Sequence, residues 1–178
     1  MQKFKMVNHS KIIELLDMKY WGFWLTMLFL MVLPAGILAE AGVESRKIVL
    51  GTHQPLSGPM KNYAQIGRGA SIYFQYLNDQ GGIHGRQLFL LQRDDRFKPQ
   101  RTLKLVEELV MKDRVFALFS GIGTETSESA MPLLKSQGVP HFFIGSNARS
   151  ITEPPRHGIF SMIPTSEVEA RVLGPVSY

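Results

Sequence analysis

The sequence contains no cysteine in its 178 residues. This absence excludes disulfide frameworks, thiolate metal sites, cysteine nucleophiles and lipid attachment through an N-terminal cysteine. Low-complexity composition is absent too, because 16 glycines and 10 prolines are too few for a collagen-like chain. A hydrophobic fraction of 44% with 20% charged residues is typical of one globular domain. The net charge of +5 is not gathered in one patch, so no pattern indicates a nucleic-acid partner.

Charged residues are also missing from the segment 21–39, which follows Lys19. This apolar run is long enough to cross a bilayer as a helix. Pro34 interrupts it, and the small residues that follow fit signal-peptidase cleavage after Ala41 or, as second choice, after Ala39. We therefore predict a cleaved export signal, with an uncleaved membrane anchor as the alternative.

The predicted organisation is a signal peptide over residues 1–41 and an exported protein over residues 42–178, located in the periplasm. Basic starts of signal peptides are short, and the segment before Met18 is too long for one. We therefore expect Met18 to be the true start of translation, with a long basic start from Met1 as the alternative. A chain without cysteine is compatible with an oxidising compartment.

Short apolar runs alternate with amphipathic segments along the rest of the chain. Strands are expected at 47–50, 87–92, 115–119, 141–144 and 159–162, and helices at 64–77, 98–112, 124–134 and from 166 onward. Such alternation predicts right-handed crossovers and a parallel sheet with helices on both faces. The expected fold class is therefore α/β, an open doubly wound parallel sheet.

Ligands of such sheets bind outside the carboxyl ends of the strands. Three loops rich in glycine, hydroxyl and amide groups are expected there: residues 54–63, 120–126 and 145–150. The loop with Gly121 and Gly123 is the best candidate, because helix N-termini offer N–H groups and a dipole that favour a carboxylate or phosphate. The alternative interpretation is that the two glycines only make a tight turn.

Catalytic patterns are not indicated. A dinucleotide site would have a third glycine where Thr126 stands, and an acidic residue where the fourth strand ends in Gly-Ser-Asn at 145–147. Ser120 lacks the surrounding glycines of a hydrolase nucleophile. The histidines at 53, 84, 141 and 157 lack metal-ligand spacing, so we expect ordinary surface or core residues. Asp94 and Asp95 fit a carboxylate pair or a solvated strand exit equally well.

A series of short motifs runs through residues 46–178. They are Ile-Val-Leu-Gly at 48–51, Pro-Leu-Ser-Gly-Pro at 55–59, Leu-Asn-Asp-Gln-Gly-Gly-Ile-His-Gly at 77–85, Asp-Asp at 94–95 and Gly-Val-Pro at 138–140. Together they resemble the Leu/Ile/Val-binding-protein-like branch of the type I periplasmic binding proteins, the solute receptors of ABC importers. The resemblance implies a lobe with strand order 2-1-3-4-5, and it covers only the N-terminal part of the family's length, so the chain is expected to be truncated inside the first lobe.

The resemblance also implies a function: the solute-binding component of an ABC-type importer for amino acids or related small amides. Such receptors capture the ligand between two lobes and deliver it to a permease in the inner membrane. They are not enzymes, and no cofactor or metal is implied. Without its second lobe, the chain is expected to bind weakly or to be a non-functional fragment. The alternative is the ligand-sensing ectodomain of a membrane-anchored receptor.

Carried over position by position, the resemblance assigns ligand-binding roles to six residues: Tyr63, Gly123, Thr124, Gly145, Ser146 and Asn147. Gly123 belongs to a main-chain cradle, and the hydroxyl of Thr124 binds the ligand carboxylate. Backbone groups of Gly145 and Ser146 bind the amino-acid head. Asn147 stands where a threonine is usual, and Tyr63 lines the mouth of the pocket.

Overall fold

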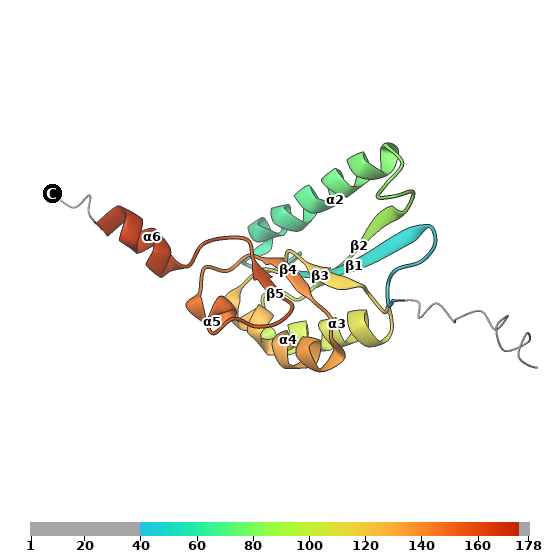
Figure 1. The fold of residues 1–178 in the computed structure, drawn as a ribbon. Helices are drawn as coiled ribbons and strands as arrows, with labels where there is room; N and C mark the ends of the chain where they lie inside the picture. The colour runs from blue at the N-terminus through green and yellow to red at the C-terminus, as the bar shows by residue number, and fades with distance from the viewer. Residues whose placement is uncertain (1–39, 175–178) are drawn as a thin grey trace, which may run out of the picture. The chain divides into compact units, whose positions relative to one another are not determined.

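The computed structural model describes residues 40–174 (Figure 1). The predicted signal peptide, residues 1–41, lies outside them apart from Glu40 and Ala41. No helix in the described range is long and apolar enough to cross a membrane. The strands are β1 (Lys47–Gln54), β2 (Gln87–Asp94), β3 (Ala117–Phe119), β4 (His141–Ile144) and β5 (Ile159–Ser161). The helices are η1 (Lys61–Ala64), α2 (Gln65–Asp79), α3 (Pro99–Met111), α4 (Thr124–Gln137), α5 (Arg149–Thr152) and α6 (Ser166–Leu173).

The five strands form one parallel sheet in the order β2-β1-β3-β4-β5. This confirms the predicted α/β class and the order 2-1-3-4-5. Strand β2 lies on one side of β1, and all later strands lie on the other side. The order in which strands are added therefore changes side between β1 and β3. Open α/β sheets bind ligands at such a switch point, next to the carboxyl ends of the strands.

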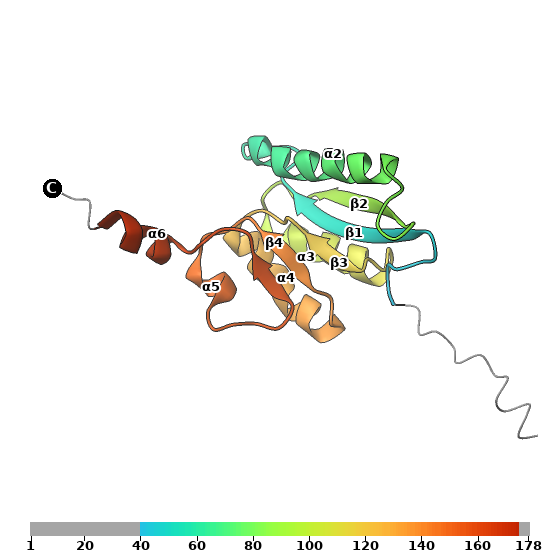
Figure 2. The same ribbon diagram turned by 45° about the horizontal axis from the view of Figure 1, so that its top comes forward.

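Helices cover the two faces of the sheet, as Figures 1 and 2 show: α2 lies on one face, and α3 and α4 lie side by side on the other. The larger core lies under α3 and α4. Its buried members are Val106, Leu109, Val110, Val115, Leu118, Ala130 and Leu134. On the α2 side, Phe74 packs with Leu50 and Ala117. The spacing of the apolar residues on α3 is the helical one, which is why this helix could be predicted.

Two strands are longer than predicted. The expected strand 47–50 extends to Gln54, and the expected strand 87–92 extends to Asp94. The reason is the parallel register, which continues without interruption to the pair Gln54↔Asp94. Polar residues at the end of β1 are buried there by pairing and by the helices, so polarity did not mark the end of the strand.

Two short helices, η1 and α5, were not predicted, and α6 begins where expected. Thr165 caps α6, since its Oγ1 accepts a hydrogen bond from Val168 N at 3.4 Å. In both views α6 stands clear of the sheet, and none of its residues is buried. Its described link to the preceding helix is an ion pair, with Arg149 Nη1 at 3.3 Å from Glu167 Oε1.

Candidate functional site

The loops after β3 and β4 lie side by side at the carboxyl edge of the sheet. Gly145 N donates to Gly121 O at 2.8 Å, and Gly123 N donates to Gly145 O at 3.3 Å. Ile122 and Gly145 form an isolated parallel bridge. Pairing thus continues past the strands, and we call residues 120–124 and 145–148 the paired loops. Their backbones hold each other at fixed distance.

Two hydroxyl groups, one from each of the paired loops, lie within hydrogen-bonding distance of each other. Thr124 Oγ1 lies 2.7 Å from Ser146 Oγ, and Ser146 Oγ also accepts from Ala148 N at 3.2 Å. Ser146 is 7% exposed, whereas Thr124 is half-buried. Because Ser146 is held by its own loop, the hydroxyl of Thr124 is the better placed of the two to exchange its partner for a ligand oxygen.

Gly123 makes this arrangement sterically feasible. It stands directly before α4 with φ +98°, a conformation that side chains disfavour. A Cβ atom there would lie 2.6 Å from Phe97 Cε2 and 2.6 Å from Thr126 Oγ1. The N-terminus of α4 therefore begins without a side-chain cap, and the N–H groups of its first turn have no partner within the helix.

Of the six predicted site residues, the structure brings Gly123, Thr124, Gly145 and Ser146 together. Asn147 follows on the same loop with an exposed side chain, and its backbone carbonyl accepts from Ser166 N at 3.1 Å. Tyr63 lies in η1 and is 52% exposed. Within the described residues, no hydrogen bond or ring contact connects the Tyr63 side chain to the other five.

Asp94 holds the loop after β1, residues 54–63, against the end of β2. Ser57 donates to its carboxylate twice, from Oγ at 2.6 Å and from N at 3.2 Å. Partial burial raises the pKa of Asp94, but the hydrogen bonds from Ser57 and from Arg96 N outweigh this and hold the pKa below its ordinary value. Asp94 is therefore a structural anchor for this loop.

Asp95 does not form a pair with Asp94, and its interpretation as a solvated strand exit is wrong. Its side chain is fully buried, and its Oδ2 accepts from His53 Nδ1 at 2.9 Å. His53 in turn lies against His141, with ring centroids 5.6 Å apart. Sequence reasoning missed this cluster because it ended β1 too early. A strand extended to Gln54 would have shown that His53 lies near the end of β1, beside the end of β2 and therefore close to Asp95.

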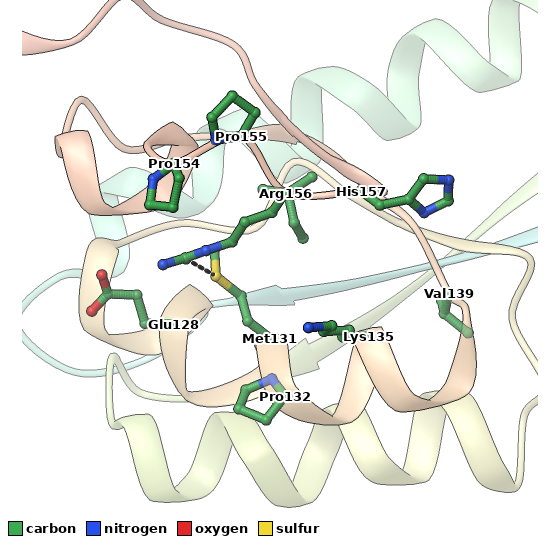
Figure 3. A pocket seen from close by; sticks show the side chains of 10 residues that line it. Glu128, Met131, Pro132, Lys135, Val139, Pro154, Pro155, Arg156 and His157 are labelled. Atoms are coloured by element: carbon green, nitrogen blue, oxygen red, sulfur yellow. Dashed lines mark hydrogen bonds between the residues drawn. The ribbon is translucent and has the colours of Figure 1, made fainter.

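A separate hollow of about 730 Å³ lies on the outer side of α4 (Figure 3). Its lining side chains come from α4, from the link between α4 and β4, and from the chain leading into β5: Glu128, Met131, Pro132, Lys135, Val139, Pro154, Pro155, Arg156, His157 and Ile159. Arg156 Nη1 lies 2.9 Å from Met131 Sδ across it. None of the predicted site residues lines this hollow.

Comparison with known proteins follows the same part of the chain. The family model of the periplasmic binding proteins matches residues 47–177. A Leu/Ile/Val-binding protein homolog 7 from Brucella suis is 25% identical over 140 residues, which are 78% of this chain and 35% of the relative. The chain spans about a third of the length of the curated relatives it matches.

Solved structures agree in fold. A substrate-binding periplasmic protein from Ralstonia solanacearum is 26% identical with a TM-score of 0.64, covering 72% of this chain and 38% of that one. The substrate-binding protein of a branched-chain amino acid transporter from Streptococcus pneumoniae, solved with isoleucine, has a TM-score of 0.65 at 19% identity, again covering 72% and 38%. At that identity the second likeness concerns the fold alone.

Proposed function

Because the chain belongs to the periplasmic binding protein family, whose members are binding proteins and not enzymes, we propose that it forms the first lobe of the solute-binding component of an ABC-type importer. The proposed ligand is an amino acid or a related small amide. The relatives named for leucine, isoleucine and valine support this class.

The observation that carries the proposal is the meeting of the paired loops, which follow β3 and β4, at the carboxyl edge of the sheet beside the strand-order switch. Thr124 offers a half-buried hydroxyl, and the first turn of α4 offers N–H groups at the positive end of a helix. These groups suit a carboxylate. Gly145 and Ser146 lie beside these groups, because Gly145 pairs with Gly121 and Gly123 and Ser146 Oγ lies 2.7 Å from Thr124 Oγ1. We propose that this loop contacts the head of the ligand.

Reversible binding fits these groups better than chemistry does. Thr124 and Ser146 hydrogen-bond to each other, and neither has a basic side chain as its described partner. A hydroxyl nucleophile needs an adjacent base to be activated. The paired loops therefore provide donors that hold an anion in place, without a group that would attack it or transfer a proton.

The rest of the importer is part of the proposal. A second lobe would close over the ligand by hinge motion, consistent with a chain that spans about a third of its relatives. A permease in the inner membrane would receive the ligand. Residues 1–41 are proposed to direct export to the periplasm and to be removed there.

The test is a titration of the 178-residue chain with isoleucine, followed by amide chemical shifts. One lobe leaves the opposite side of the ligand in water, so we expect a dissociation constant above about 1 mM, which corresponds to only ~4 kcal/mol. Shifts should concentrate at the paired loops. Shifts confined to the hollow beside α4 would contradict the proposed site.

A pair of hydroxyl variants on α4 makes the test specific. Thr124→Ala removes the hydroxyl on the paired loops. It should weaken isoleucine binding by about 1–3 kcal/mol, the cost of leaving a charged oxygen of the ligand carboxylate underpaired. Ser136→Ala removes an exposed hydroxyl near the other end of the same helix, where Oγ donates to Leu133 O at 2.8 Å and accepts from Gln137 Nε2 at 3.5 Å. Equal affinities of both variants and the original chain would rule out Thr124 as a ligand residue.

A further inference from the structure

Three buried titratable side chains gather directly beneath the paired loops. Within residues 40–174, the buried side chains include only three that titrate, namely His53, Asp95 and His141. They come from the end of β1, the residue after β2 and the start of β4. The two imidazole rings meet edge to face, 5.6 Å apart and at 70°. One cluster therefore connects three strands.

Asp95 fixes the orientation of the first ring. Its carboxylate accepts from Phe97 N at 2.8 Å and from Thr102 Oγ1 at 3.1 Å, as well as from His53 Nδ1 at 2.9 Å. Because a carboxylate only accepts, the hydrogen of His53 must be on Nδ1. The opposite edge of the ring, with Nε2, then points to the β3 side. Among residues 40–174, neither this nitrogen nor either nitrogen of His141 has a hydrogen-bond partner.

Both rings converge on Gly121. A Cβ atom built on this residue would overlap His53 Nε2 and lie 2.7 Å from His141 Nε2. The imidazoles thus occupy the space that a side chain at position 121 would fill. Close packing of this kind transmits displacements, because the interior has no free volume to absorb them.

Gly121 is also one of the residues that hold the paired loops together. Its carbonyl accepts from Gly145 N at 2.8 Å. The preceding carbonyl, of Ser120, accepts from Gln54 Nε2 at 2.5 Å. A shift of the rings would therefore move the carbonyl that sets the distance between the two loops.

We propose that His53 and His141 are positioning residues of the ligand site, whose rings fill the space beside Gly121 and so set the contact between Gly121 O and Gly145 N. The effect of the two rings on ligand affinity rests on the proposed function. Their effect on the contact between Gly121 O and Gly145 N does not rest on it, because this contact exists without a ligand.

The cluster also makes the contact sensitive to acid. Burial, and then the nearby His53, hold the pKa of His141 well below its ordinary value of 6.5. Around the pair, Asp95 is the only buried acid in the described range, while Thr102 from α3 and Gln54 from β1 do not titrate. Protonation of His141 would place an unpaired charge beside His53, so the rings should separate and loosen the loops.

The experiment measures the hydrogen-exchange protection factor of the Gly145 amide in the ligand-free 178-residue chain. His53→Asn keeps an N–H donor toward Asp95 but removes the ring atoms that face Gly121. We expect it to lower the protection of Gly145 about tenfold. His157→Gln, at an exposed histidine away from the cluster, should leave protection unchanged. In the original chain, protection should fall only at a pH well below 6.5, because the pKa of His141 is held well below that value, while the remote Arg86 amide in the turn before β2 should not show this fall.

Further variants keep the test decisive if His53→Asn unfolds. His141→Leu preserves volume and removes the titrating group, so the acid-induced loss at Gly145 should disappear. Gly121→Ala alone should lower the protection of Gly145, and it should lower it less when His53→Asn is also present. A double-mutant cycle measures this coupling. Unchanged Gly145 protection in His53→Asn, an unchanged acid-induced loss in His141→Leu, or purely additive effects in the cycle would overturn the proposal. If isoleucine shifts no amide while Gly145 behaves as expected, the proposed ligand fails and the positioning role stands.

Discussion

Gly123 shows how much of the site depends on one missing side chain. We expect Gly123→Ala to lower the free energy of unfolding by about 2–4 kcal/mol, since it adds backbone strain to overlap with Phe97. Gly138 is the matched control: its φ of +67° is also left-handed, but an added Cβ meets no atom within 4 Å. Gly138→Ala should cost only about 1–2 kcal/mol. Urea unfolding followed by circular dichroism measures both, and equal losses would contradict the steric argument.

Asp94 should make the stability of the chain fall in acid. Its pKa is lowered in the folded state, so its contribution is complete above the unfolded value of about 3.8 and is lost as the pH falls through the folded value. Asp94→Asn should therefore be less stable than the original chain at pH 7 and should lose less stability between pH 5 and pH 3. Asp79→Asn, at an exposed carboxyl on α2, should keep the original slope. The same slope in all three proteins would show that Ser57 does not stabilise the ionised carboxylate.

At the scale of elements, α3 is held to the sheet by its inner face. Leu109 is fully buried against β3 and α4, whereas Leu103 on the same helix is 40% exposed. We expect Leu109→Ala to cost about 2–5 kcal/mol, because it removes buried methyl groups and leaves a cavity. Leu103→Ala should cost well under half as much. Thermal unfolding of the two variants compares them directly, and similar melting temperatures would mean that α3 packs differently.

The alternation of apolar runs with amphipathic segments was enough to predict the class of fold and most elements. Helical spacing on α3 and strand-like runs such as β3 are local signals. The ends of β1 and β2 are not local, because polar residues continue there as strand only through pairing with a neighbour. Similarly, α5 is a single short turn, too brief to carry a periodic pattern.

The candidate site was predictable in part for the same reason. Gly123 and Thr124 lie at a strand-to-helix junction, which topology alone marks as a ligand edge. The contact of Thr124 with Ser146, and the cluster of His53 with Asp95, join residues far apart in the chain. Such contacts depend on register and packing, which no spacing in one sequence reveals.

For the whole molecule, processing of the N-terminus decides which protein is exported. Mass spectrometry of the exported form should find Gly42 as the first residue, or Glu40 if cleavage follows Ala39, because small residues precede both sites. Changing Ala39 and Ala41 together to leucine should block cleavage at both sites, while Ala35→Leu should not. Recovery of intact residues 21–39 in the membrane fraction would instead support the anchored receptor.

The position of β1 inside the sheet, between β2 and β3, also has a consequence in time. One edge of β1 pairs with β2, but the other pairs with β3, where Leu50 is opposite Ala117. During synthesis this second edge stays unpaired until the ribosome has added β2, α3 and β3. At about 5–20 residues per second, the wait is on the order of several seconds. The order of strands thus leaves this edge of β1 open to pairing with the edge of another chain for that interval.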